Sequence, residues 1–109
     1  MTGLTEVPIS GSFMNAEYEW DEAKAAANLL KHETSFDEAT RALEDPRKIE
    51  FVDERLDYRE DLIQTIGMSS GRILFVVSVM RGDVCRIISA RKANRREQET
   101  YFQNRPLYR

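Results

Sequence analysis

The chain reads RILFVVSVM over 72–80, RGD over 81–83, VCRIISA over 84–90 and RKANRREQETY over 91–101. The first run is nearly continuous in apolar, β-branched and aromatic residues, which predicts a central strand over 73–80 that is covered on both faces. Gly82-Asp83 predicts a two-residue hairpin loop, because glycine takes the positive φ that such loops need. We therefore expect a hairpin whose second strand covers 84–90.

Positive charge gathers in the same part of the chain. Residues 1–70 hold seven lysines and arginines against sixteen acidic residues, whereas residues 71–109 hold nine against three. The formal net charge of −3 therefore averages an acidic first part and a basic last third. This asymmetry indicates a polyanionic partner for the last third.

The remaining composition is that of one globular domain. Of the 109 residues, 41% are apolar and 32% are charged, which argues against overall disorder. No apolar run approaches the ~20 residues of a membrane helix, and the N-terminus lacks the pattern of a signal peptide. We expect a cytoplasmic protein that does not bind membranes, with a flexible leader over 1–16, a single domain over 17–103 and a loose tail over 104–109.

A first helix is predicted after Trp20, with Asp21 as its N-cap. One face of this helix is apolar and consists of Ala23, Ala26, Ala27 and Leu30 at helical spacing. A polar stripe on another side consists of Lys24, Asn28 and Lys31. The apolar stripe is expected to be buried, and its alanines suggest that the helix lies close to its neighbour.

A second helix begins at the capping box of Ser35 and Glu38 and is stopped by Asp45-Pro46. Strands are expected over 18–20, 48–53 and 62–68 in addition to the hairpin. Asn94 and Glu97 resemble a further capping pair, which opens a last helix to about Gln103. The predicted fold is α+β with the order β-α-α-β-β-β-α, a small antiparallel sheet and helices on one face.

Familiar catalytic motifs are missing from the sequence. It has no P-loop, no G-x-G-x-x-G, no G-x-S-x-G and no metal-ligand spacing. With a single histidine and a single cysteine, zinc sites and papain-like chemistry are excluded. Cys85 lies in an apolar run, so we interpret it as a small buried hydrophobe.

The basic residues of the last third are the strongest candidates for function. They are Arg81, Arg86, Arg91, Lys92, Arg95 and Arg96, which can be a solvated surface or a binding site. Arg86 lies in mid-strand, where a charge is costly unless it faces a groove or a partner, and an arginine fork suits phosphate. Strict alternation places Arg86 and Arg91 on opposite faces, so they converge only if the strand ends, twists or bulges between them.

Two further residues have two readings each. His32 can act as a general acid or base, or it can cap the end of the first helix. Tyr101 can belong to the core or can stack on a base.

Several segments resemble the BrnT family of type II toxins. They are WDEAKAAANL over 20–29, Lys31-His32, SFDEA over 35–39 and RIISAR over 86–91, with further matches over 97–101 and at Asp45-Pro46. The resemblance runs from about Glu17 to Phe102. One departure follows Lys31-His32, where many relatives have glycine and this chain has Glu33.

The resemblance implies a RelE-like fold and a ribonuclease that arrests translation in its own cell. It also implies a BrnA-like antitoxin with a ribbon-helix-helix DNA-binding part, so that contact with DNA is only indirect, through the antitoxin. RNA cleavage by its own 2′-hydroxyl needs proton transfer and stabilisation of the phosphorane, and members of the group often use arginine and lysine for this.

We assign the roles on this basis as a hypothesis. Arg86 and Arg91 hold the scissile phosphate, and His32 or Lys31 assists proton transfer. The residues expected to contact the RNA are Arg59, Arg81, Lys92, Arg95 and Tyr101. Neither a metal nor another cofactor is needed.

Two other functions remain open. A non-catalytic module, such as a degenerate toxin, would use the same basic surface only to dock a protein or RNA. A DNA-binding regulator is the third choice, because the chain shows neither a helix-turn-helix nor a ribbon-helix-helix pattern.

Overall fold

The structure is a computed structural model that describes residues 17–53 and 62–103. The leader predicted over 1–16 and the tail predicted over 104–109 lie outside the described residues, as does Arg59.

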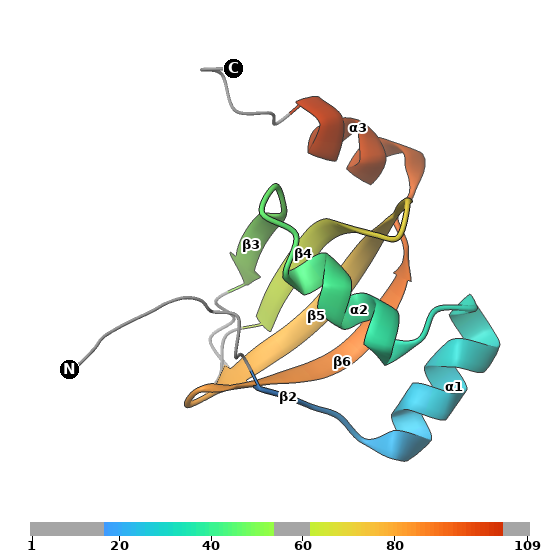
Figure 1. The fold of residues 1–109 in the computed structure, drawn as a ribbon, viewed down its shortest axis with the longest axis vertical. Coiled ribbons are helices and arrows are strands. Elements are labelled where there is room, and N and C mark those ends of the chain that lie inside the picture. The colour runs from blue at the N-terminus through green and yellow to red at the C-terminus, as the bar shows by residue number, and fades with distance from the viewer. Residues whose placement is uncertain (1–16, 54–61, 104–109) are drawn as a thin grey trace.

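Within these described residues, five strands form one mixed sheet in the spatial order β2-β6-β5-β4-β3 (Figure 1). The strands are β2 (Glu17–Glu19), β3 (Ile49–Asp53), β4 (Leu62–Ser69), β5 (Arg72–Arg81) and β6 (Val84–Lys92). The α+β class is as predicted. The predicted order β-α-α-β-β-β-α was one strand short, because the four strands expected over 48–53, 62–68, 73–80 and 84–90 all follow the first two helices.

The prediction of a purely antiparallel sheet was also wrong. β3, β4, β5 and β6 are antiparallel neighbours, but β2 runs parallel to β6. The chain leaves β2 for a helix rather than for a hairpin, so its neighbour is not obliged to run in the opposite direction.

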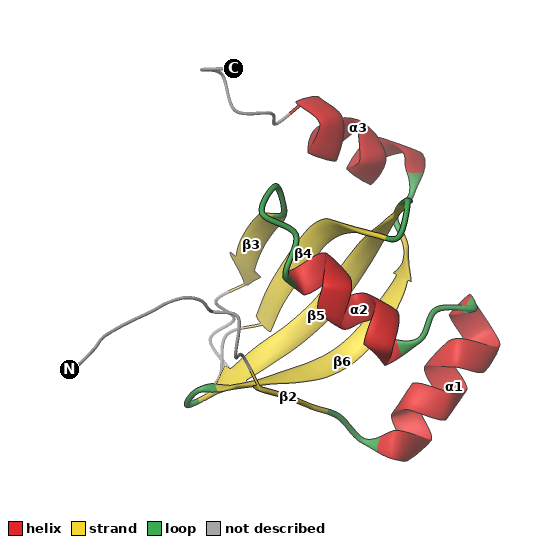
Figure 2. Cartoon of the chain, in the orientation of Figure 1, coloured by secondary structure: helices red, strands yellow, loops and turns green. Residues whose placement is uncertain are grey.

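The described part of the chain also forms three helices, α1 (Glu22–His32), α2 (Phe36–Leu43) and α3 (Arg95–Gln103) (Figure 2). Asp21 caps α1 by accepting from the backbone N–H groups of Ala23 and Lys24 at 2.8 and 3.1 Å. The capping box of Ser35 and Glu38 is present at α2. At α3, Asn94 and Glu97 accept from each other's backbone N–H groups, both at 2.8 Å. All three predicted helix starts are confirmed.

The main core lies between α2 and one face of the sheet. Its buried residues are Phe36, Ala39, Ala42, Leu43, Leu74, Val76, Ile87 and Ala90. A Cβ added at Gly67 would overlap the carbonyl oxygen of Ala42, so α2 lies directly against β4 at this point. Only glycine permits this approach.

The sequence predicted that all helices pack on one face of the sheet. This was wrong for α3, which packs on the face opposite to α2. Tyr101 is 6% exposed and belongs to a second cluster with Ile66, Ile73 and Ala93. Ile66 and Ile73 alternate along their strands with residues that face α2, so they point to the other side. The Tyr101 hydroxyl donates to Asp45 at 2.6 Å, which ties α3 to the end of α2.

The packing of α1 reverses the predicted pattern. The predicted apolar stripe, Ala23, Ala26, Ala27 and Leu30, is exposed, whereas Asn28 from the predicted polar stripe is only 7% exposed. Asn28 donates to the carbonyl oxygens of Thr34 and Ala90 at 2.9 and 2.7 Å and accepts from the Ala90 N–H at 3.2 Å. Because β2 pairs only with residues 84–86 of β6, the side chain of Asn28 replaces the missing strand partner at Ala90.

The end of α1 carries some backbone strain. Glu33 has φ 55° and ψ 36°, the left-handed conformation, and its N–H donates to the Leu29 carbonyl at 2.8 Å. Glycine favours this position because it has no Cβ. This explains why glycine is the residue expected after Lys31-His32.

None of the described helices is both long enough and apolar enough to cross a membrane.

Candidate functional site

A bulge in β6 brings two candidate arginines to the same face of the sheet. Ser78 pairs with Ile87, and the preceding Val77 pairs with Ser89, so β6 has one extra residue, Ile88, at this point. On either side of the bulge, Arg86 pairs with Val79 and Arg91 pairs with Phe75.

Val79 and Phe75 are four residues apart on β5 and therefore point to the same side. This side is the one away from α2, since Leu74 and Val76 belong to the core beneath α2. The condition stated from the sequence is met, because β6 bulges between Arg86 and Arg91. Arg81, the last residue of β5, follows Val79 by two positions and therefore points to the same side. We call the side that carries Arg81, Arg86 and Arg91 the arginine face.

Arg91 is firmly held by its neighbours. Its two terminal nitrogens each donate to one carboxylate oxygen of Glu97 at 2.9 Å, and one of them also donates to the Lys92 carbonyl at 3.2 Å. The guanidinium carbon lies 4.3 Å from the centre of the Phe75 ring, within cation–π range. Hydrogen bonding to Glu97 raises the pKa of Arg91. These contacts use three of the five N–H groups of the guanidinium.

Glu97 has two tasks in this arrangement. It binds Arg91 and, as part of the cap of α3, accepts from the Asn94 N–H at 2.8 Å. Burial raises the pKa of the Glu97 carboxyl, but the hydrogen bonds from Arg91 and Asn94 outweigh it, so that the pKa is lowered. The sequence reasoning recognised Glu97 only as a cap, although its spacing of six residues from Arg91 places both at one corner of the fold.

Arg86 is paired more loosely. One terminal nitrogen lies 3.3 Å from a carboxylate oxygen of Glu19, its neighbour on β2, and the side chain is 27% exposed. The sequence argument that a mid-strand arginine needs a groove or a partner is therefore met in part by Glu19. The guanidinium remains within reach of solvent.

The arginine face extends across the sheet to an exposed aromatic ring. Phe51 of β3 pairs with Gln64, which pairs with Val77, so Phe51 lies on the same side as the arginines. Its side chain is 44% exposed. Three strand spacings separate β3 from β6, or about 14 Å. The sequence placed Phe51 in a half-buried strand, and its alternation with Glu50 was the signal that could have identified it.

The two proton-transfer candidates lie at the end of α1. His32 follows Asn28 by four residues and is partly buried, so it lies on the side of α1 that meets β6. Lys31 is exposed. Within residues 17–53 and 62–103, no hydrogen bond or ion pair joins either side chain to Arg86 or Arg91.

The predicted RNA contacts are divided among several places. Lys92 pairs with Leu74 and so points to the α2 side, away from the arginine face. Arg95 is 93% exposed on α3 and lies 3.6 Å from Glu99. The buried ring of Tyr101 has no open face for a base, and burial together with the hydrogen bond to Asp45 raises the pKa of its hydroxyl to about 12.

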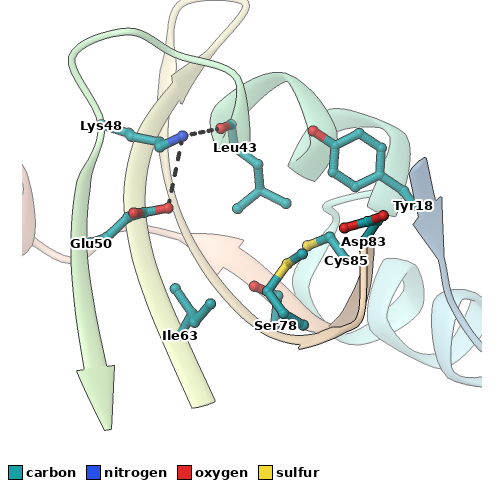
Figure 3. Close-up of a pocket in the computed structure, with 9 residues that line it drawn as sticks. Tyr18, Leu43, Lys48, Glu50, Ile63, Ser78, Asp83 and Cys85 are labelled. Atoms are coloured by element: carbon teal, nitrogen blue, oxygen red, sulfur yellow. Dashed lines mark hydrogen bonds and ion pairs between the residues drawn. The ribbon is translucent and has the colours of Figure 1, made fainter. Parts of the chain in front are cut away.

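A separate cavity of about 160 Å³ lies on the α2 side, beside the hairpin (Figure 3). Lys48 points across it, donates to the Leu43 carbonyl at 2.9 Å and lies 3.8 Å from Glu50. Burial raises the pKa of the Cys85 thiol at its floor, which disfavours the nucleophilic thiolate. Because the amine is already bonded and the thiol stays protonated, this cavity is a weaker candidate than the arginine face.

No three His, Cys, Asp or Glu side chains in the described part of the chain are grouped so that they could hold a metal ion.

Comparison with known proteins places these observations in a family. A family model described as "Ribonuclease toxin, BrnT, of type II toxin-antitoxin system" matches residues 20–97, which is more than half of the chain. The matched region includes α1, the bulged strand and the Arg91–Glu97 pair. No individual curated protein matches the chain. The chain therefore belongs to the BrnT family of ribonuclease toxins, which act in type II toxin–antitoxin systems with an antitoxin as partner.

Proposed function

We propose that the chain is a metal-independent endoribonuclease that cleaves RNA through the RNA's own 2′-hydroxyl and inhibits translation in the cytoplasm. The observation that supports this most strongly is the bulge at Ile88, which brings Arg86 and Arg91 to one face of the sheet. A surface with two arginines, a third at Arg81 and an exposed aromatic ring suits single-stranded RNA, whose phosphates bind arginine and whose bases stack.

The reaction needs no group beyond the protein and the RNA. The 2′-oxygen loses its proton and bonds to the phosphorus, and the bond from phosphorus to the 5′-oxygen breaks. The leaving oxygen takes up a proton, so the products are a 2′,3′-cyclic phosphate and a 5′-hydroxyl. The protein has to stabilise the negative charge of the phosphorane and to move two protons.

Arg91 suits the first task because it is already oriented. Glu97 holds the end of the guanidinium, and the Nε–H and one terminal N–H remain, which form a second fork of the kind that binds phosphate bidentately. A pre-oriented donor costs no reorganisation during the reaction. We therefore assign Glu97 the role of a positioning residue for Arg91.

Arg86 contacts the same stretch of RNA backbone. The strand partners of Arg86 and Arg91 are four residues apart, which corresponds to about 13 Å along β5. Two arginine side chains can converge across this span on the scissile phosphate and its neighbour. Phe51 offers a stacking surface for a base, and Arg81 extends the basic track.

His32 and Lys31 are the proposed proton-transfer groups. In support, α1 is fixed to β6 by Asn28 at Ala90, directly beside Arg91, and His32 lies one turn further on the same helix face. The RNA substrate would close the remaining distance between these groups and the arginines. The partner is a BrnA-like antitoxin with a ribbon-helix-helix part, by which the complex would contact DNA.

The test is expression of the full chain without its antitoxin. We expect growth to stop and cellular RNA to be cut, and we expect Arg86→Ala and Arg91→Ala to relieve both effects. Arg72→Ala is the matched control. Arg72 is also a strand arginine with a carboxylate partner, Glu38 at 3.1 Å, but it points to the α2 side. If Arg72→Ala relieves toxicity as fully as Arg86→Ala does, the arginine face has no special role.

One observation favours a second candidate, a non-catalytic module that binds RNA or a protein. Both Arg86 and Arg91 already have carboxylate partners, Glu19 and Glu97, which reduce the net charge offered to a phosphate. Normal growth together with a folded, soluble product would support this candidate. Cleavage of RNA by the purified chain would exclude it.

A further inference from the structure

The first helix exposes most of its apolar surface. Leu30 is 88% exposed and Leu29 is 51% exposed. The preceding alanines Ala23, Ala26 and Ala27 are exposed as well. Only Asn28 is buried, with Ala25 and His32 partly buried on the side that meets β6. Large apolar side chains gathered on one face of an exposed helix mark a surface that another molecule covers.

A groove adjoins this surface between α1 and the start of α2. It has a volume of about 330 Å³, and its apolar walls are Trp20, Ala25, Ala26, Leu29 and Phe36. Trp20 and Phe36 form its floor as an edge-to-face pair with ring centres 5.8 Å apart. Two carboxylates, Glu22 and Asp37, border the groove, one from each helix. We call this groove together with Leu30 the α1 groove.

We propose that the α1 groove binds an amphipathic helix of the antitoxin, with large apolar residues on one face bordered by lysine or arginine. This rests on the family's antitoxin partner and not on the RNA chemistry proposed above. A helix suits the site because the groove runs between two helices, and the alanines of α1 allow close approach. A basic border suits it because the carboxylates of Glu22 and Asp37 line the groove together with its apolar walls.

The site is separate from the arginine face. The groove lies between α1 and the start of α2, whereas the register of β6 against β5 turns Arg86 and Arg91 to the side of the sheet away from α2. Substitutions in the α1 groove should therefore release the toxin from its antitoxin and leave its own activity intact.

Thiol labelling of Leu30→Cys tests this directly. The probe is the antitoxin encoded alongside this chain, purified as a complex with it, and mass spectrometry locates the maleimide adduct. We expect the new thiol to react at least tenfold more slowly in the complex than in the free chain. Lys24→Cys lies on the other side of α1 and is the matched control, for which we expect less than a twofold change.

Equal labelling rates of Leu30→Cys in the free chain and in the complex would overturn the proposal. Slow labelling in the free chain would overturn it too. In that case a dimer by light scattering would identify a second copy as the occupant, and a monomer would identify a segment of the same chain.

A charge placed at Leu30, beside the groove, supplies an independent measurement. We expect Leu30→Glu to weaken antitoxin binding at least tenfold, which corresponds to about 1.4 kcal/mol, and Lys24→Glu to change it less than twofold. Because Leu30 is so exposed, the variant should unfold at the wild-type temperature and cleave RNA at the wild-type rate. If neither protein cleaves RNA, the proposed function fails while the docking result stands on its own.

Discussion

Replacing Asn28 by alanine should destabilise the protein more than any other change on α1. The side chain makes three hydrogen bonds to backbone groups, at 2.7, 2.9 and 3.2 Å, and two of them join α1 to Ala90 across 62 residues of sequence. Asn28→Ala leaves the Ala90 N–H, the Ala90 carbonyl and the Thr34 carbonyl without these partners in a buried place. Thr34 is itself 0% exposed.

The size of the effect follows from these three groups. An unsatisfied buried polar group costs about 1–3 kcal/mol, and water entering at the edge of the sheet reduces the sum. Alanine favours the helix over asparagine by roughly 0.5 kcal/mol, which offsets only a small part. We expect a net loss of about 2–4 kcal/mol in the free energy of unfolding. In a domain of this size that lowers the melting temperature by about 10–20 °C.

The assay is urea and thermal unfolding of the full chain, followed by circular dichroism. Lys24→Ala is the control on the same helix, and we expect it to change the free energy of unfolding by less than about 0.5 kcal/mol. Asn28→Asp keeps the shape but replaces both donors by acceptors, so it should be at least as damaging as alanine. A loss below about 0.5 kcal/mol for Asn28→Ala would refute the assignment of Asn28 as a replacement strand partner.

Two further changes test the site and the end of α1. Glu97→Gln should lower the free energy of unfolding by about 1–2 kcal/mol at pH 7, because it weakens a bidentate charged pair that is only partly exposed. The pKa of Glu97 is lowered on folding, so its contribution is present above the unfolded value and is lost as pH falls through the folded one. The difference between the wild-type and Glu97→Gln free energies of unfolding should therefore begin to shrink only as the pH falls below about 4, and a difference that stays constant on further acidification would contradict this. Glu33→Gly should raise the melting temperature by about 4–8 °C, because relief of the left-handed strain at this residue is worth about 1 kcal/mol. An unchanged melting temperature would show that the strain is compensated elsewhere.

Local signals in the sequence predicted the elements well. The hairpin was expected over 73–80 and 84–90 and is found over 72–81 and 84–92. The three helix starts follow from capping side chains that accept from backbone N–H groups at most three positions further along the chain. Such signals act within one turn of chain and need no knowledge of the tertiary structure.

Features that depend on distant partners were not predictable. The exposed stripe of α1 and the buried Asn28 result from an unpaired stretch of β6 some 60 residues away. The parallel pairing of β2 has no local signature. Tyr101 is buried against Ile66, Ile73 and Ala93, and its hydroxyl donates to Asp45, which lies 56 residues away in the sequence.

The bulge at Ile88 lies between these cases. The sequence reasoning showed that Arg86 and Arg91 need an interruption of the strand in order to share a face, but it did not locate one. The position is set by the register of β6 against β5, in which Ala90 and Ile87 must both reach the core beneath α2. The spacing of these two apolar residues by three positions, where an unbroken strand requires an even number, is the signal that could have located it.

The most direct test of the central claim is the chemistry of cleavage by the purified full-length chain. We predict that it cleaves single-stranded RNA in the presence of EDTA and leaves 2′,3′-cyclic phosphate and 5′-hydroxyl ends. Arg86→Ala and Arg91→Ala should lose this activity, and Arg72→Ala should keep it. Products with 5′-phosphate ends, or no cleavage by a folded chain, would contradict a ribonuclease that works through the 2′-hydroxyl on the arginine face.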